Sequence, residues 1–176
     1  MRPLILDRDG VINKERDNYI LSPEEWEPIP GSLEAIARAK SLGFYIIVIS
    51  NQSAIGRGWM SVDTLNLINQ KMQRKLAKLG GKIDIFLFCP HLPTDNCDCR
   101  KPSATLLNNL KSRMEIDFTG CLLVGDRISD LEVAQKIGAR PILVESGKSI
   151  CHPPPRIAIF KDLSTALKKT LFKELE

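Results

Sequence analysis

The stretch Leu4-Ile5-Leu6-Asp7-Arg8-Asp9-Gly10-Val11 decides how the rest of the chain is interpreted. Its first three residues are apolar, as in a parallel strand that is buried on both faces, and two carboxylates follow. Ligands of open α/β sheets bind beyond the carboxyl ends of the strands, so Asp7 and Asp9 stand where chemistry can occur. Two close carboxylates repel each other unless a proton or a cation intervenes. Mg²⁺, which prefers hard oxygen ligands, is the expected cation.

Outward from this stretch, apolar and β-branched segments alternate with amphipathic ones. Further strands are predicted at 44–49, 83–88, 119–124 and 141–144, with a short edge strand at 157–160. Helices are predicted at 33–41, 62–79, 103–114 and 129–137, with a last one after 162, and the expected N-caps are Ser32, Ser61 and Asp162. This alternation implies parallel pairing through right-handed crossovers. The expected fold is α/β, a doubly wound three-layer α/β/α sandwich with a mostly parallel sheet.

Bulk composition narrows the class of protein. A chain of 176 residues suggests one domain, 1–176, and 43% hydrophobic with 26% charged residues is ordinary for a soluble globular protein. No apolar run approaches the roughly 18 residues of a membrane span, and no signal peptide is visible, so the cytoplasm is expected. A net charge of +4 without a Lys/Arg block fits a small anionic substrate and argues against nucleic acid.

Three predicted strands end in polar residues, namely Asp7 with Asp9, then Ser50, then Asp126. A parallel sheet brings these ends to one edge, where Asp7 and Asp126 can share Mg²⁺. Phosphoryl transfer needs an in-line nucleophile and an acid for the leaving oxygen. Asp7 fits the nucleophile, forming an aspartyl-phosphate, and Asp9 fits the acid and later the base.

Two further residues support this hypothesis. Lys101 would supply positive charge to the phosphoryl oxygens, as Ser50 would supply a hydroxyl. Asp130 follows Asp126 by one helical turn. It is either another metal ligand or a first-turn acid stabilised by the helix dipole, and the supporting role is favoured.

A cysteine-rich loop at 89–99 predicts a second metal. Its three thiolates and one imidazole, from Cys89, His91, Cys97 and Cys99, match a closed tetrahedral structural Zn²⁺ site. Four ligands leave no open position, so no direct catalysis is expected there. Arg100 and Lys101 follow Cys99 immediately, and the loop would therefore fix two cations over the phosphate site. Cys121 and Cys151 lack partners by spacing, and His152 is expected to be a loop residue.

The motifs at 7–11, Ser50, Lys101 and 125–130 resemble those of the haloacid dehalogenase superfamily of phosphatases, over residues 4–147. Segments 6–13, 50–53 and 97–102, with Cys89-Pro90-His91, are similar to two zinc-loop branches. These are the heptose-bisphosphate phosphatases and the histidinol-phosphate phosphatases. Segment 19–37 is more similar to the heptose branch.

The resemblance implies a capless, cytosolic, monomeric Mg²⁺ enzyme with a structural Zn²⁺. Its implied reaction removes the 7-phosphate of a heptose 1,7-bisphosphate, in nucleotide-activated heptose synthesis for the lipopolysaccharide core. Histidinol phosphate is the alternative substrate; a polynucleotide 3′-phosphatase and a non-catalytic zinc-stabilised binding module are less favoured. By position, Asp7, Asp9 (through its carbonyl) and Asp126 hold Mg²⁺. Substrate contacts are implied for Asp17, Asn18, Tyr19, Asn51, Gln52, Ser53, Arg100 and Arg127.

Overall fold

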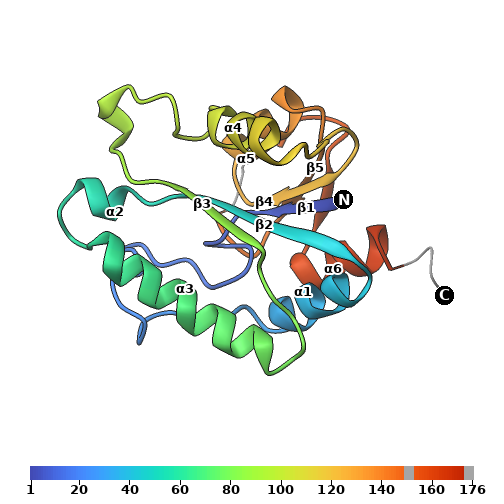
Figure 1. The fold of residues 1–176 in the computed structure, drawn as a ribbon, viewed down its shortest axis with the longest axis horizontal. Coiled ribbons are helices and arrows are strands. Elements are labelled where there is room, and N and C mark those ends of the chain that lie inside the picture. Colours follow the sequence, from blue (N-terminus) through green and yellow to red (C-terminus); the bar gives the residue numbers. More distant parts are fainter. Residues whose placement is uncertain (149–152, 173–176) are drawn as a thin grey trace.

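The computed structural model describes residues 1–148 and 153–172, so Cys151 and His152 lie outside the described part. Six strands form one sheet in the order β3-β2-β1-β4-β5-β6, and every neighbouring pair is parallel (Figure 1). The strands are β1 (Arg2–Leu6), β2 (Phe44–Asn51), β3 (Ile85–Cys89), β4 (Leu122–Gly125), β5 (Arg140–Val144) and β6 (Ala158–Phe160). The predicted doubly wound α/β fold is confirmed.

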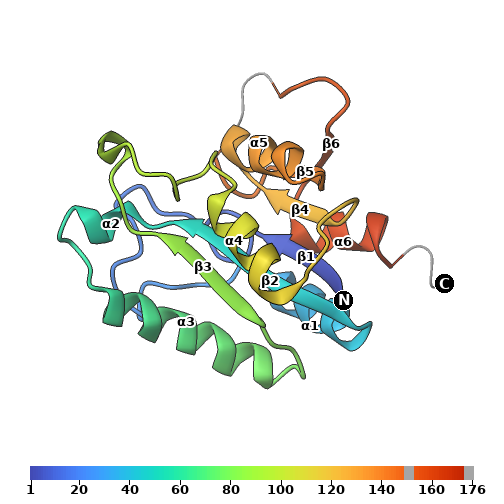
Figure 2. The same cartoon turned by 45° about the horizontal axis from the view of Figure 1, so that its top comes forward.

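The helices lie in two layers on either side of the sheet. They are α1 (Ser32–Ser41), α2 (Ser53–Gly56), α3 (Val62–Ala77), α4 (Thr105–Met114), α5 (Ile128–Lys136) and α6 (Leu163–Thr170), with a short 3₁₀ turn η1 (Pro93–Asp95). One face is covered by α1, α3 and α6, and the other by α4 and α5 (Figures 1 and 2). After the exposed Arg2, strand β1 is buried between two apolar cores: Leu4 and Leu6 pack into one and Ile5 into the other. The continuous apolar run of β1 follows from this burial on both faces.

The chain order places the carboxyl ends of β1, β2 and β4 side by side. From β1 the chain runs through α1 to β2 and through α3 to β3, then crosses through α4 to β4 on the other side of β1. Leu6 pairs with Val48 in β2 and with Val124 in β4. Residues that follow these three positions therefore converge at the point where the strand order reverses, which is where open α/β sheets bind ligands.

Local details agree only in part with the sequence. The hydroxyl of Ser61 accepts a hydrogen bond from the Thr64 amide, and Asp162 caps α6 in the same way through Thr165, as predicted. Ser32 is not a cap. Its hydroxyl donates to the Ile12 carbonyl at 2.6 Å and ties α1 to the loop after β1, while Gly31 precedes the helix.

Two further structural points concern the helices. The short helix α2 begins at Ser53, within a segment for which the sequence predicts no helix. Within the described part of the chain, α3 is the longest helix, with 16 residues, and none has the length and apolar character needed to cross a membrane.

Candidate active site

A buried cluster of carboxylates and one ammonium group lies beyond the ends of β1 and β4. Asp7, Asp126 and Asp130 bring carboxylate oxygens within 4.8 Å of one another. The Lys101 ammonium lies 2.9 Å from Asp7 Oδ1 and 2.6 Å from Asp130 Oδ1, and its side chain is 3% exposed. It also donates to the Ile49 carbonyl at 3.2 Å. Lys101 thus joins the end of β1 and the first turn of α5 to β2.

The charges in this cluster do not balance. Burial raises the pKa of Asp7 to about 8, and the charges of Asp130 and Asp126 add to the effect against the opposing influence of Lys101. Burial also raises the pKa of Asp126 to about 6, with a contribution from Asp130. Burial alone would lower the pKa of Lys101, but Asp130 and Asp7 outweigh it, and the net shift is upward. Three carboxylates and one ammonium leave excess negative charge, which a divalent cation would neutralise.

The oxygen atoms of Asp126 fit a metal-binding role. Oδ2 accepts a hydrogen bond from the Lys148 amide at 2.9 Å, whereas the buried Oδ1 has no hydrogen-bond partner among the described residues. Two glycines surround this carboxylate closely. A Cβ on Gly10, whose φ is +81°, would approach Asp126 Oδ2 to 2.6 Å, and one on Gly147 would approach it to 2.1 Å. Small residues therefore keep space for the Asp126 carboxylate.

Asp130 is occupied by the protein itself. Its Oδ2 accepts from the Arg127 amide at the start of α5 at 3.1 Å, and its Oδ1 pairs with Lys101. These contacts fit the supporting role favoured from the sequence. Asp7 and Asp126 are the members of the cluster with an oxygen left for a metal, since the described contacts of Asp7 engage Oδ1.

The side chain of Asp9 points away from this cluster into a hydrogen-bonded clamp. The Arg8 guanidinium donates to both of its carboxylate oxygens, at 3.1 and 3.0 Å. Asn13 Nδ2 donates to Oδ1 and Gln52 Nε2 to Oδ2, each at 2.9 Å. Burial would raise the pKa of Asp9, but Arg8 and the amide donors hold that pKa below its usual value. Asp9 therefore sits as an oriented carboxylate beside the cavity.

Two residues predicted to contact substrate, Gln52 and Asn51, also support neighbouring groups of the site. Gln52 Nε2 also donates to Ser50 Oγ at 2.7 Å, so one amide joins Ser50 to Asp9. The Asn51 side chain accepts from the Lys101 amide at 3.0 Å and donates to the Lys101 carbonyl at 3.2 Å. These contacts fix the backbone of Lys101 opposite the end of β2.

The site opens into a cavity of about 370 Å³. Of the residues predicted to be functional, it is lined by Asp7, Asp9, Asp17, Tyr19, Ser50, Asn51, Gln52, Ser53, Arg100, Lys101 and Arg127. Asn18 is exposed and is not part of the lining. Six residues that were not predicted to contact substrate also line it: Arg8, Glu15, Arg16, Ile20, Ser129 and Lys148. Most of them border predicted motifs, and Lys148 follows the β5 strand end, which is the signal that could have identified it.

The loop after β1 forms one wall of the cavity. The rings of Tyr19 and Trp59 meet edge to face with centroids 5.4 Å apart, and the Arg57 guanidinium lies over both. Arg57 Nε also donates to the Tyr19 hydroxyl at 3.2 Å. Farther along, Glu15 forms an ion pair with Arg127. This loop therefore borders the cavity through contacts with the loop after α2 and with Arg127 at the start of α5.

The four zinc-type ligands converge in the loop after β3. Sγ···Sγ distances among Cys89, Cys97 and Cys99 are 3.3 to 3.7 Å, and His91 Nδ1 lies 3.2 Å from Cys99 Sγ and 3.7 Å from Cys89 Sγ. Ligands about 2.3 Å from a tetrahedral Zn²⁺ would be separated by similar distances. The cluster therefore fits a structural zinc ion, as predicted.

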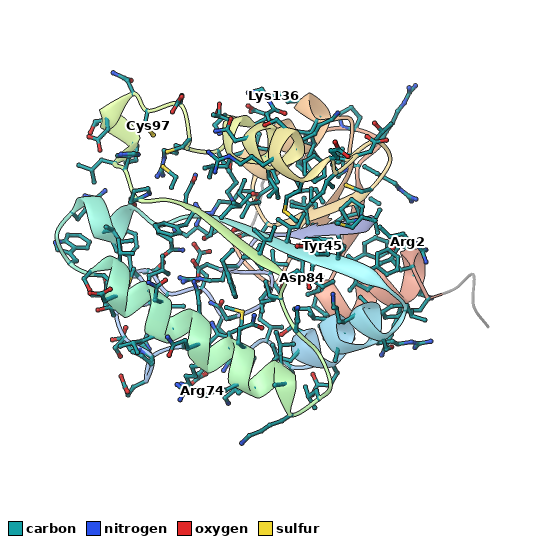
Figure 3. All side chains as sticks on the ribbon, viewed as in Figure 1. Arg2, Tyr45, Arg74, Asp84, Cys97 and Lys136 are labelled. Carbon is teal, nitrogen blue, oxygen red and sulfur yellow. The ribbon has the colours of Figure 1, made fainter. Side chains whose placement is uncertain are left out.

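The zinc-type loop is connected to the cavity by several contacts. Figure 3 shows Cys97 on this loop, which projects beyond the end of β3. The carbonyls of Cys89 and Pro90 accept from the amides of Gln52 and Gly56, at 2.7 and 2.9 Å. Arg100 Nη1 donates to the His91 carbonyl at 3.1 Å. The loop thus contacts α2 and orients Arg100, which lines the cavity.

The site and the fold together define a hydrolase of the haloacid dehalogenase (HAD) type. Asp7 and Asp9 follow the central strand of a parallel sheet, a third carboxylate follows β4, and a buried lysine lies beside them. A family described as HAD-hydrolase-like matches residues 98–160.

Comparison with individual proteins indicates a narrower family than this family match does. A Pseudomonas putida protein, D-glycero-beta-D-manno-heptose-1,7-bisphosphate 7-phosphatase, is 44% identical over 175 residues, covering 97% of this chain and 100% of its own. The Pseudomonas aeruginosa protein of the same name is 43% identical over 172 residues, covering 96% and 97%. The crystal structure of D,D-heptose 1,7-bisphosphate phosphatase from Bordetella bronchiseptica, complexed with magnesium and phosphate, is 37% identical, with a TM-score of 0.90, covering 98% of this chain and 99% of that one. The chain belongs to the D-glycero-D-manno-heptose-1,7-bisphosphate 7-phosphatase family.

Proposed function

We propose that this protein is a Mg²⁺-dependent phosphatase that removes the 7-phosphate of D-glycero-D-manno-heptose 1,7-bisphosphate. The observation that carries the proposal is the buried cluster of Asp7, Asp126 and Lys101, of which Asp7 and Lys101 line the cavity, in a chain whose relatives match over nearly its whole length. Relatives at 43 and 44% identity are named for the β anomer, which is the anomer proposed here. Histidinol phosphate, the alternative from the sequence, is not favoured by these relatives.

In the proposed reaction, a carboxylate oxygen of Asp7 attacks the phosphorus of the 7-phosphate. An Asp7–phosphorus bond forms as the bond from phosphorus to the C7 oxygen breaks, and Asp9 donates a proton to that leaving oxygen. Water then attacks the aspartyl-phosphate, Asp9 accepts a proton from it, and Asp7 is regenerated with release of inorganic phosphate. Asp9 lines the cavity from its clamp with Arg8, and it must carry a proton for the first step.

The proposed metal ligands are Asp7, Asp126 and the backbone carbonyl of Asp9. A bound Mg²⁺ would neutralise charge on the phosphoryl group and orient it. Lys101 and the Ser50 hydroxyl would stabilise the other phosphoryl oxygens. Arg100 would bind the second phosphate, because a guanidinium pairs with phosphate through two parallel hydrogen bonds. A cytoplasmic monomer serving heptose synthesis for the lipopolysaccharide core, built as one capless domain over 1–176, remains part of this proposal.

Arg100→Ala tests the substrate assignment. We expect kcat/KM for the heptose 1,7-bisphosphate to fall about 10- to 100-fold, since a hydrogen bond to a charged group is worth roughly 1.5–3 kcal/mol. For a monophosphate ester such as histidinol phosphate, which lacks the second phosphate, the change should stay below about threefold. Phosphate release from a panel containing both heptose bisphosphate anomers and histidinol phosphate is the measurement.

The matched control is Arg74→Ala, which removes an exposed arginine from α3 on the side of the molecule away from Cys97 (Figure 3). It should leave both kcat/KM values unchanged. An equal loss on bisphosphate and monophosphate in Arg100→Ala would reject the role of Arg100 in binding the second phosphate. A wild-type preference for histidinol phosphate would reject the proposed substrate.

Removal of zinc should impair substrate use more than Mg²⁺ binding. The loop at 89–99 orients Arg100 and contacts α2 but supplies no group to the carboxylate cluster. After zinc chelation and restoration of Mg²⁺, we expect kcat/KM for the bisphosphate to fall by about tenfold or more, by analogy with the loss of groups that orient binding residues. The apparent Mg²⁺ affinity should change less. Zinc add-back is the control, and full activity of a folded, zinc-free protein would contradict the coupling.

A further inference from the structure

Among the described residues, Arg8 is the largest of the buried charged side chains, and one of its hydrogen-bond donor groups is not used. It is 2% exposed, and its Nε and Nη2 atoms donate to Asp9, with Nη2 also donating to Gln52 Oε1 at 3.1 Å. Its Nη1 atom is buried and has no hydrogen-bond partner within the described ranges 1–148 and 153–172. A buried donor without a partner is costly, so a missing acceptor is expected nearby.

The complementary atom comes from α3. Asn69 Oδ1 is also buried and, in the same described ranges, also without a partner. Both side chains line one small cavity of about 10 Å³, together with Ser50 and Gln52 and with apolar walls from β2, α3 and β3. A space of this size holds about one water molecule, which needs two or more polar partners. Arg8 Nη1 offers a donor and Asn69 Oδ1 an acceptor, so a single water can satisfy both.

We propose that this cavity is a site for one structural water, and that Asn69 is a positioning residue that acts through this water and Arg8 on Asp9. The proposal rests on the proposed function, in which Asp9 protonates the leaving oxygen. The water and Asn69 would hold the guanidinium at Nη1, the atom that Asp9 and Gln52 leave unbonded. Arg8 in turn sets the direction of the Asp9 carboxylate through its two-point hydrogen bond.

The chain of contacts explains why a buried asparagine oxygen on α3 faces a charged residue of the active site. Without the Nη1 anchor, the guanidinium can rotate and carry Asp9 with it. A proton donor displaced from the leaving oxygen slows only a step that needs its proton. A leaving group that departs as a stable anion does not need that proton, so its departure should be insensitive to Asn69.

A high-resolution crystal structure of the wild-type protein tests the water site without reference to activity. We expect one ordered water within hydrogen-bond distance of both Arg8 Nη1 and Asn69 Oδ1. In Asn69→Leu, which has a similar size but no acceptor, that water should be lost. An apolar-filled or empty cavity in the wild type, or a direct Arg8–Asn69 contact, would overturn the water site.

Kinetics test the positioning role. We compare heptose 1,7-bisphosphate, whose alkoxide leaving group needs protonation, with p-nitrophenyl phosphate, whose leaving group does not. In Asn69→Leu, kcat/KM for the bisphosphate should fall about tenfold, as for other small displacements of reacting groups. The value for p-nitrophenyl phosphate should stay within about twofold of wild type. The matched control is Asn66→Leu, at an exposed position of the same helix, which should change neither.

Other outcomes are equally decisive. Equal losses on both substrates would show a general structural defect, and no loss on either would show that Asn69 does not act on Asp9; each overturns the positioning role while the proposed function stands. If the wild-type protein releases phosphate from neither substrate, the proposed function fails and the positioning role fails with it. The crystallographic result alone then decides the water site.

Discussion

Asp7→Asn should lower kcat for phosphate release by at least about 10³-fold while the fold stays intact, because it removes the attacking carboxylate. The substitution keeps the shape of the side chain in a site that is 5% exposed. It removes one of three clustered carboxylates that face a single ammonium, so it relieves like-charge repulsion even as it weakens the Lys101 pair. We therefore expect a metal-free melting temperature equal to or above that of the wild type.

Two measurements accompany the rate. Acid quenching during turnover of substrate labelled in the 7-phosphate should trap phosphate covalently on the wild type and none on Asp7→Asn. Asp63→Asn, at an exposed position in the first turn of α3, is the control and should behave like the wild type in both assays. Unchanged phosphate release by Asp7→Asn would end the assignment of the nucleophile and would favour a binding module.

Lys101→Met should reduce both stability and activity. The ammonium is buried between Asp7 and Asp130, and removing one partner of a buried ion pair costs roughly 3–5 kcal/mol. We expect the free energy of unfolding in urea, measured without divalent cations, to fall by about 3 kcal/mol. With Mg²⁺ present, kcat should fall about 10²- to 10³-fold, since a fixed positive charge on the phosphoryl oxygens is lost. Lys111→Met, at an exposed position of α4, should change stability by less than about 0.5 kcal/mol.

A double variant separates the two effects of Lys101. Lys101→Met with Asp130→Asn removes both charges of the closer pair, so much of the stability should return. Activity should not return, because no cation then faces the phosphoryl group. Recovery of activity together with stability would show that Lys101 serves only to neutralise Asp130.

The strands of the sheet could be predicted because strands that are buried on both faces consist of continuous apolar residues. Leu4, Ile5 and Leu6 pack alternately into two cores, so all three must be apolar, and the strand is visible from composition alone. Helix starts were less reliable. Ser32 has a typical N-cap residue type, but a carbonyl from the loop after β1 lies within reach of its hydroxyl. That partner is distant in sequence, and no local pattern could reveal it.

The same distinction explains which parts of the site could be predicted. The strand-end carboxylates and the closely spaced cysteines can be recognised from the local sequence. The structure brings Asp7 and Asp126 together in one cluster and the cysteines, with His91, together in another. Gln52 and Asn51 line the cavity, and their amides also hold Ser50, Asp9 and the backbone of Lys101. Their positions were predictable, but their partners depend on how far each side chain reaches across the folded sheet.

The packing of Tyr19 against Trp59 lies in loops, apart from the sheet that carries the reacting groups. The wall that these two rings and Arg57 fasten belongs to the loops at 14–20 and 57–59, whereas the reacting groups belong to the sheet. Mutations in these loops can alter which sugar phosphate fits without moving a single reacting atom. Duplicated genes with this architecture could therefore acquire new substrates while their catalytic chemistry is inherited unchanged.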